Sequence, residues 1–553
     1  MGTTSIPNPD TKPAPSSASP FPPDLSHSPL LGILGVLLGA VIVTLTGRLL
    51  SLGLADLRGN VGIGYDEGTW ISSAFNIALM FIGPFSVYLG SLLGPRQVLL
   101  TSASVFTLIC AFLPMVHAYG LLIVLLAIAG LTSGTFYPLT LTFALRNIPL
   151  RYLAMVLGLY VFCIEGAVNF APSLYGYFRN HISWEWMFWF PAMATPVMMA
   201  CIYFGIPQSP KTQSKNEPPS FAGFLFISAG FALLYAALDQ GQRLDWWRSG
   251  LFNALVAGAV LFLLCGVGER LRRPNFLIDL PYLRNWNTIL LGFALFSFRF
   301  VFLGTIVIIP LSLSVRGLDP EQLGPAVLWT AVFELALGFI GASLLYKGID
   351  SHLLMAIGFA AVAFACLINA DFTSAWAAQN YYRSELLMAV GQSFAMLGVV
   401  SSLILQATFS GALEAPQRIL TFSAFVHTVR LLGGQAGAVF LGHFIADREK
   451  LHSNLLGLHI QAGNWLTDGS LRGLAAGLAG RSNGVVGATG RALDIVASRL
   501  RLQAYALTFI DAFHLVAWTC VVMLLVTVFL RKSPMNFRQM PALQNGSPRE
   551  NRP

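Results

Sequence analysis

Long apolar segments alternate with short polar ones along nearly the whole chain. Fourteen of them approach the length of about 20 residues at which a helix crosses the hydrocarbon layer of a membrane. They span residues 30–52, 70–89, 97–116, 121–144, 153–172, 186–204, 221–238, 249–266, 288–311, 325–344, 352–368, 384–409, 422–444 and 509–530. None alternates apolar and polar residues as membrane β-strands do. Because lipid offers no hydrogen bonds to a backbone, each segment predicts a helix.

Composition supports this interpretation. Only 10% of the 553 residues are charged and 55% are hydrophobic, whereas soluble domains carry about 25% charged residues. We therefore predict an all-α polytopic membrane protein. The net charge of +8 comes from basic residues in short loops and in the C-terminal tail, so nucleic acid is not expected as a partner. The six cysteines lie in apolar segments without a CxxC pair, so we expect no disulfide framework, metal or cofactor.

Orientation is predicted from Lys and Arg in the loops. Among the short loops, one set holds eleven of them and the opposite set six, and the tail 531–553 adds five more to the richer side. Cytoplasmic loops carry the excess, so both termini should face the cytoplasm in a cell inner membrane. Residues 1–29 are rich in Pro and Ser and lack the pattern of a signal peptide, which predicts a disordered cytoplasmic tail.

One connection is unusually long. Ile445 to Leu507 separates the last two spans and contains amphipathic stretches at 451–460 and 492–502. Loops of this length often have a function, such as docking a partner, although an insertion of this size is also tolerated on a surface. The topology places it outside the cytoplasm.

Ionisable residues inside the apolar segments are the candidates for function, because charge in hydrocarbon is costly and must face an interior path or a partner. Carboxylates can load and release protons, so three residues are proton-coupling candidates: Glu165, Glu334 and Asp511. Five others are candidates for the transport path or for gating: Arg48, Asn169, Arg299, His427 and Arg430. Each of them could instead pin two helices together through one buried pair. No Walker A loop or catalytic constellation is present, which favours a secondary transporter over an enzyme or an ATP-driven pump.

Several motifs resemble the major facilitator superfamily, and within it the fourteen-span drug:proton antiporters of the EmrB/QacA type. The segment 237–247 is similar to the family's "LD-G---DW" turn, and 68–71, 184–188, 430–434 and 511–513 are similar to its other signatures. The loop between the second and third spans keeps Gly90, Gly94 and Arg96 but has no acidic residue. In the fifth span, the antiporter motif is represented by Pro172 and Gly176. The family's first-span acidic residue is replaced by Thr46, so coupling has either moved, for example to Glu165, or the chain is a divergent branch with different energetics.

The resemblance implies a major facilitator fold. A six-helix half at 30–204 and another at 288–530, which includes the external loop 445–507, would rock around a midplane site, with two extra helices and linkers at 205–287. The implied function is proton-coupled export of hydrophobic or amphipathic small molecules across the lipid bilayer. The implied partners are a periplasmic membrane-fusion adaptor docked on the long loop and an outer-membrane channel; the loop could alternatively form a lid over the mouth of the path. A specific metabolite or siderophore exporter and a non-transporting receptor or scaffold are the alternative functions.

Overall fold

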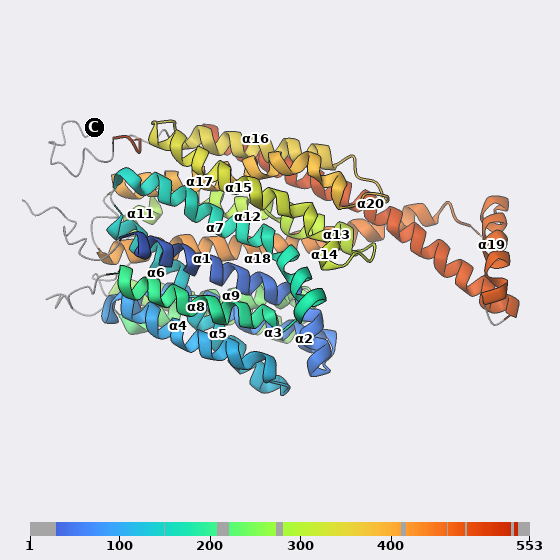
Figure 1. Ribbon diagram of the computed structural model, residues 1–553, viewed down its shortest axis with the longest axis horizontal. Helices are drawn as coiled ribbons and strands as arrows, with labels where there is room; N and C mark the ends of the chain where they lie inside the picture. The colour runs from blue at the N-terminus through green and yellow to red at the C-terminus, as the bar shows by residue number, and fades with distance from the viewer. Residues whose placement is uncertain are drawn as a thin grey trace, which may run out of the picture.

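The computed structural model describes residues 29–531, except 149, 207–219, 273–279, 411–415, 462 and 482–483. It also describes residues 536–539. Every regular element in this part of the chain is a helix (Figure 1). The predicted tail 1–29, except for its last residue, and most of 531–553 lie outside the described residues.

Fourteen helical segments of the described chain are long and apolar enough to cross a membrane. Each coincides with one of the predicted segments, so the prediction of fourteen spans is confirmed. The spans made of one uninterrupted helix are α1 (Pro29–Leu52), α3 (Tyr65–Leu93), α4 (Pro95–Phe112), α8 (Trp186–Gly205), α9 (Phe221–Gly241), α10 (Gly250–Arg272), α15 (Pro325–Tyr346), α16 (Ser351–Asn369), α17 (Tyr382–Phe409), α18 (Pro416–Gly457) and α20 (Gly484–Phe529).

Three spans are composite. The fourth is α5 (Tyr119–Ser133) followed by α6 (Phe136–Asn147), and the fifth is α7 (Leu150–Tyr177) continued by the π-helical turn η2 (Phe178–Ile182). The ninth is α12 (Trp286–Val301), the π-helical turn η4 (Gly304–Ile308) and α13 (Ile309–Ser314). Such π-helical turns occur frequently at functional sites. The connecting helices are η1 (Leu113–Met115), α2 (Leu54–Val61), η3 (Trp246–Arg248), α11 (Leu280–Arg284), α14 (Pro320–Leu323), η5 (Ala378–Tyr381), α19 (Trp465–Leu478) and η6 (Ala479–Arg481).

The spans pack as two helix groups. A pair of helices, α9 and α10, lies between the two groups in the sequence. The N-group, α1 to α8, packs around α1, α7 and α8, and the C-group, α12 to α20, packs around α17, α18 and α20. The groups meet where α7 lies against α15 and α17, and where α18 lies against α3 and α6. The pair α9 and α10 attaches through α9, which contacts α3 and α18.

Small residues allow the two groups to approach closely. A Cβ atom on Gly158 of α7 would lie 2.5 Å from the carbonyl oxygen of Gly338 in α15. Side chains larger than hydrogen would separate the helices there. Packing of small residues drives helix association in membranes, where the hydrophobic effect contributes little.

The last two spans extend far beyond the bundle and form an arm (Figure 1). The helix α18 continues to Gly457, α20 begins at Gly484, and α19 packs on α20. The 24 residues 484–507 alone extend for about 35 Å at 1.5 Å per residue. We call the end of the bundle that carries the arm the arm side.

Much of the connection 445–507 is helical. The apolar segments end near 444 and 509, but the helices α18 and α20 continue beyond them. Polar side chains hold the two extensions together, since the Arg501 guanidinium Nε lies 3.3 Å from the carboxylate of Glu449. Hydropathy marks where the lipid ends, whereas the helical backbone needs only its own hydrogen bonds to continue.

Candidate functional site

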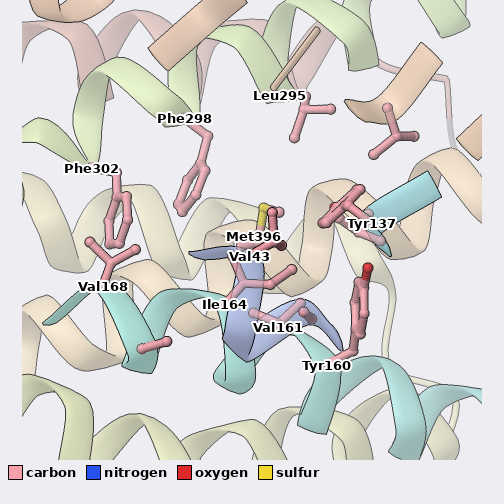
Figure 2. Close-up of a cluster of buried hydrophobic side chains, with 14 of the residues drawn as sticks. Val43, Tyr137, Tyr160, Val161, Ile164, Val168, Leu295, Phe298, Phe302 and Met396 are labelled. Atoms are coloured by element: carbon pink, nitrogen blue, oxygen red, sulfur yellow. The ribbon is translucent and has the colours of Figure 1, made fainter. Parts of the chain in front are cut away.

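The middle of the bundle holds a dense cluster of aromatic and aliphatic side chains (Figure 2). They come from α1, α6, α7, α12 and α17, and include Val43, Tyr137, Tyr160, Val161, Ile164, Val168, Leu295, Phe298, Phe302 and Met396. All are buried. Polar groups among them are therefore shielded from water, and their electrostatic interactions are strong.

Glu165 is one of these polar groups. Its side chain is fully buried in α7, and its carboxylate lies 3.8 Å from the Arg299 guanidinium Nη1 of α12. Neither carboxylate oxygen accepts a hydrogen bond from the described residues. Arg430 of α18 also interacts electrostatically with this carboxylate. A buried carboxylate without hydrogen-bond donors is poorly solvated, and protonation relieves this cost.

The second buried carboxyl group, Glu334 of α15, is connected to α7 by an amide. Asn169, one helical turn after Glu165, donates to Glu334 Oε1 at 3.2 Å and to Gln392 Oε1 at 2.9 Å. Gln392 of α17 donates in turn to the Thr305 hydroxyl of η4 at 2.9 Å. The chain of hydrogen bonds therefore crosses from the N-group to three elements of the C-group.

Arg430 and His427 lie beside Tyr137, which α6 of the N-group supplies. The Arg430 guanidinium carbon is 4.1 Å from the centre of the Tyr137 ring, a cation–π contact. The His427 ring centre is 5.3 Å from the same ring. A Cβ atom on Gly83 would lie 2.6 Å from the His427 ring, so the glycine makes room for it. We call Glu165, Asn169, Arg299, Glu334, Gln392 and Arg430 the central cluster.

Arg48 of α1 lies at the same interface. Its Nη2 donates to the carbonyl oxygen of Ile306 at 2.6 Å. This carbonyl lies in the π-helical turn η4, where the regular hydrogen-bond pattern of the helix changes. Arg48 therefore ties the first span to the ninth.

Asp511 lies in a different place from the other predicted residues. It is at the base of the arm, partly exposed, with His452 Nε2 at 2.9 Å and Arg448 Nε at 3.6 Å. These partners come from the extension of α18 beyond its apolar segment. Asp511 therefore connects α18 with α20 and is not brought into the central cluster.

The five residues assigned to family motifs from the sequence lie in α3, α4, α7 and the turn between α3 and α4. Arg96 donates to the Tyr203 carbonyl at 2.8 Å and stacks over the Tyr203 ring, which joins α4 to α8 inside the N-group. Gly94 has φ +85°, a conformation that side chains disfavour, and Gly90 is buried in α3. Pro172 lies inside α7. A Cβ on Gly176 would lie 2.4 Å from the backbone nitrogen of Glu321, so this glycine brings α7 against α14 of the C-group.

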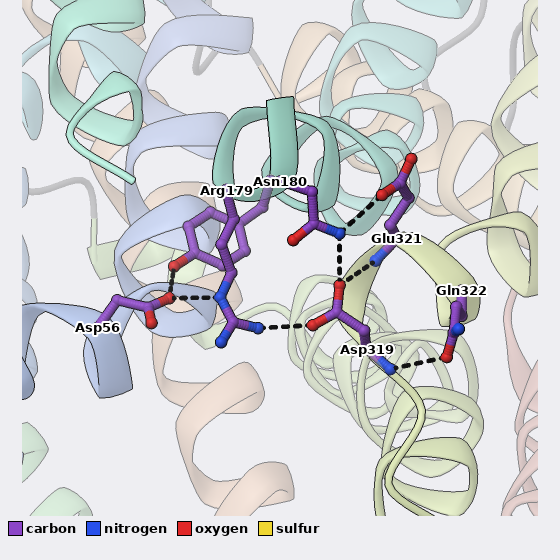
Figure 3. A network of polar contacts seen from close by, with 7 residues as sticks. Asp56, Arg179, Asn180, Asp319, Glu321 and Gln322 are labelled. Atoms are coloured by element: carbon purple, nitrogen blue, oxygen red, sulfur yellow. Dashed lines mark hydrogen bonds and ion pairs between the residues drawn. The ribbon is translucent and has the colours of Figure 1, made fainter. Parts of the chain in front are cut away.

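A second polar network crosses between the groups on the arm side (Figure 3). The Arg179 guanidinium lies 3.3 Å from the carboxylate of Asp56 in α2 and 2.6 Å from that of Asp319 in the C-group. Asn180 donates to Asp319 at 2.8 Å and to Glu321 at 2.7 Å, and the His181 ring is 2.9 Å from Glu321. We call these six residues the arm-side network.

The arm-side network depends on a local distortion. Arg179, Asn180 and His181 all lie on the π-helical turn η2, so three consecutive side chains reach partners in other elements. The Tyr175 hydroxyl, one turn earlier, also hydrogen-bonds to Asp56. Hydrogen bonds from Asn180 and His181 lower the pKa of the Glu321 carboxyl group. The network joins the two groups at this end of the bundle.

Several of these residues were not singled out from the sequence. Gln392 and Thr305 are uncharged, and Tyr137 resembles any other aromatic residue in an apolar segment. In the sequence, Arg179 and Asp319 fall between the predicted apolar segments, where charged residues are common. A search of the apolar segments for amides, in addition to charges, would have found Gln392.

Comparison with known proteins identifies the family. Residues 36–438 match the model of the Major Facilitator Superfamily. The chain belongs to this superfamily. Its members are membrane transporters, so this superfamily protein is a multi-pass transporter and not an enzyme.

Relatives in this superfamily are distant. The protein is 25% identical over 453 residues to the multidrug export protein EmrB of Haemophilus influenzae. The matched region covers 81% of this chain and 87% of that protein. It is 22% identical to the fatty acid resistance protein FarB of Neisseria gonorrhoeae, with coverage of 73% and 78%. Among solved structures, the proton:xylose symporter XylE matches with a TM-score of 0.56 at 12% identity, covering 93% of this chain and 98% of that one. This last likeness supports the fold alone.

Proposed function

We propose that this superfamily member exports hydrophobic or amphipathic small molecules and that inward proton flow drives the export. The observation that carries the proposal is the pair of buried carboxyl groups, Glu165 and Glu334, at the contact between the helix groups. Each has at least one oxygen without a hydrogen-bond donor among the described residues. In that setting, proton uptake lowers the free energy of the buried carboxyl group. The group can release the proton once the transport path opens to water.

The position of the carboxyl groups supports coupling to motion. Glu165 belongs to the N-group and its partner Arg299 to the C-group, so rocking of the groups would separate them. Proton uptake by Glu165 weakens the attraction to Arg299 and favours separation. Protonation and the opening of the path would then depend on each other, which is the requirement for coupled transport.

The substrate class follows from the surroundings and from the relatives. Helices that carry the central cluster also contribute the buried aromatic and aliphatic side chains of Figure 2, and such surroundings suit apolar molecules. The relatives include a multidrug export protein and a fatty acid resistance protein. We propose amphipathic dyes and long-chain fatty acids as the first substrates to test.

The test uses purified protein in liposomes with an imposed pH gradient. We expect export of a fluorescent amphipathic dye or a fatty acid that requires the gradient and that Glu165→Gln abolishes. Asp511→Asn is the matched control, because Asp511 is a carboxyl group outside the central cluster; it should retain the gradient dependence. Normal gradient-driven export by Glu165→Gln would refute the role of Glu165 and leave Glu334 as the coupling residue. A lack of export of either class would favour a specific metabolite exporter or a non-transporting protein.

We also propose that the arm docks a periplasmic membrane-fusion adaptor that leads to an outer-membrane channel, with the arm side external. The support is the exposure of large apolar side chains along the arm, including Leu455, Leu458, Trp465 and Val486. Apolar surface of this extent outside a membrane indicates a binding surface. The lid alternative requires the arm to cover the bundle, whereas it extends away from it (Figure 1).

Deletion of residues 464–490 distinguishes the adaptor-docking proposal from the lid alternative. The deletion removes α19, η6 and the first seven residues of α20, and it leaves the apolar segment 509–530 intact. Loss of adaptor co-purification with transport in liposomes unchanged supports docking. Loss of liposome transport with adaptor binding unchanged supports the lid and refutes docking.

A further inference from the structure

The seventh span carries a carboxyl group outside the central cluster. Asp239 lies in the last turn of α9 and is partly buried. Its Oδ1 accepts a hydrogen bond from Gln435 Nε2 of α18 at 2.7 Å. Its Oδ2 accepts from the Ser73 hydroxyl of α3 and, at 3.4 Å, from Gln240 Nε2. Three helices of different parts of the bundle therefore converge on this carboxyl group.

The hydrogen bonds around Asp239 accommodate both of its protonation states. The Ser73 hydroxyl has two acceptors within reach, Asp239 Oδ2 and the Thr69 carbonyl oxygen at 2.9 Å. When Asp239 is ionised, Ser73 donates to it. When Asp239 is protonated, its O–H can donate to Ser73 Oγ, and the Ser73 hydrogen turns to the Thr69 carbonyl. A proton can thus be taken up or released without leaving a buried polar group unpaired.

The same network connects inward to the central cluster. Gln435 Oε1 accepts a hydrogen bond from the Tyr235 hydroxyl at 2.9 Å. The preceding residue, Gly434, lies against Arg299, because a Cβ atom on Gly434 would be 3.6 Å from the Arg299 guanidinium. Arg299 is the partner of Glu165. Tyr235 interacts electrostatically with both Asp239 and Arg299, so it lies between the Asp239 network and the Glu165–Arg299 pair.

The network also connects outward to the arm side. Arg243 Nε donates to Gln240 Oε1 at 2.7 Å. The Arg243 guanidinium lies 5.3 Å from the centre of the Trp70 ring and is partly exposed. Gln240 also donates to Ser73. Polar side chains thus continue from Asp239 to the surface at the end of α9.

No fixed counter-charge holds Asp239 in its ionised state. Within the part of the chain that the structure describes, its partners are Ser73, Gln240 and Gln435, and none of them is charged. Arg243 lies in the turn that follows α9, four residues after Asp239, and α12 contributes Arg299 beyond Tyr235. The other ionisable groups on the helices packed against α9 are further along them. They are Asp66 and Glu67 at the start of α3, Arg430 and His427 before Gln435 in α18, His443 and the charged residues from Asp447 onward after it, and Glu269, Arg270 and Arg272 at the far end of α10.

We infer that Asp239 is a further proton-binding residue of the transport cycle, outside the central cluster, which takes up a proton from the arm side and releases it toward that cluster. The inference rests on the proposed proton coupling. In the exchange, a proton from water neutralises the carboxylate, and the same proton leaves when the carboxylate is ionised again. The extra helix pair α9 and α10 would then take part in coupling through α9.

The experiment compares Asp239→Asn, which retains the hydrogen-bonding shape but cannot titrate, with Asp239→Glu, which can. Asp245→Asn is the matched control, because Asp245 is an exposed carboxyl group in the next turn, paired with Arg248. Infrared difference spectra between acidic and basic pH report carboxyl protonation directly in the purified protein. We expect Asp239→Asn to remove one protonated-carboxyl band and to reduce gradient-driven export by about a hundredfold, as is typical for loss of a proton-transfer group. Exchange of substrate without a gradient should persist, and Asp239→Glu should restore the pH profile.

The outcomes separate this inference from the proposed function. An unchanged infrared difference spectrum in Asp239→Asn overturns the inference, and so does wild-type gradient-driven export by that variant. If either result occurs while Glu165→Gln abolishes gradient-driven export, the proposed function stands alone. If wild-type export does not respond to a pH gradient, the proposed coupling fails and the transport role of Asp239 fails with it. Loss of both driven export and exchange in Asp239→Asn, without rescue by Asp239→Glu, shows a structural anchor and overturns the inference.

Discussion

At the scale of single residues, the central cluster depends on charges that balance one another in a dry environment. Glu165 is fully buried, and the side chain of Arg299 is only 15% exposed. Removing one member of such a pair leaves the other charge without compensation, whereas removing both is often tolerated. The two residues should therefore be coupled in stability as well as in transport.

We predict that Arg299→Gln lowers stability by about 3 kcal/mol, because it leaves the Glu165 carboxylate without its nearest cation. The double variant Arg299→Gln/Glu165→Gln should be less destabilised than the sum of the two single variants by at least about 1 kcal/mol. Thermal unfolding in detergent measures all three. Strict additivity would show that the 3.8 Å contact contributes nothing to the fold.

A glycine contributes to the same interface through its missing side chain. In Gly176→Ala, the added Cβ would meet the backbone of Glu321 at 2.4 Å, and a backbone cannot rotate away as a side chain can. We expect a loss of about 1–3 kcal/mol, as for other overpacked sites, measured as a lower Tm. Gly473→Ala is the control. No atom lies within 4 Å of a Cβ there, so alanine should leave α19 unchanged or slightly stabilised. Equal Tm values for the two variants would contradict the close contact of α7 with α14.

At the scale of elements, the π-helical turn η2 presents the arm-side network to α2 and α14. We predict that Arg179→Gln speeds amide hydrogen exchange in both η2 and 319–323, because Arg179 contacts carboxylates from both helix groups. The pairs are partly exposed, so the increase should not exceed about tenfold. In the control Arg248→Gln, the lost pair with Asp245 lies within one turn, and faster exchange should stay in that turn. An effect of Arg179→Gln confined to η2 would show that the network does not join the groups.

The pH dependence of the arm-side network follows from Glu321. Hydrogen bonds from Asn180 and His181 lower the pKa of this carboxyl group in the folded protein. A lowered pKa means that its contribution is complete above the ordinary carboxyl pKa and is lost as the pH falls through the folded value. Acidification below about pH 4.5 should therefore lower the protection of 319–323, measured as the exchange rate relative to the intrinsic rate at the same pH. In Glu321→Gln this acid response should be missing; a response of the same size would assign it to Asp56 or Asp319.

At the scale of the whole molecule, the arm makes the two ends of the bundle different, and topology decides which cell compartment each one faces. We predict that a tag near Gly480, in the arm, is external, while tags at Gln213 and after Pro553 are cytoplasmic, because Lys and Arg are more frequent in the short loops on the latter side. Labelling of intact and opened cells with an impermeant reagent measures this. Protection of the Gly480 tag in intact cells would reverse the orientation and remove the adaptor proposal.

The sequence by itself determined the number, the position and the helical character of the spans, because lipid requires about 20 apolar residues and internal hydrogen bonds for each. It also indicated Glu165, Glu334 and Arg430, since charges in apolar segments are conspicuous. Only the tertiary structure decided which of these residues meet. Glu165 and Arg299 are far apart in the chain, and their contact depends on how α7 and α12 pack. The tertiary structure also revealed the arm and the partners of Asp511. Hydropathy could not predict them, because it does not distinguish a helix that continues into water from a loop.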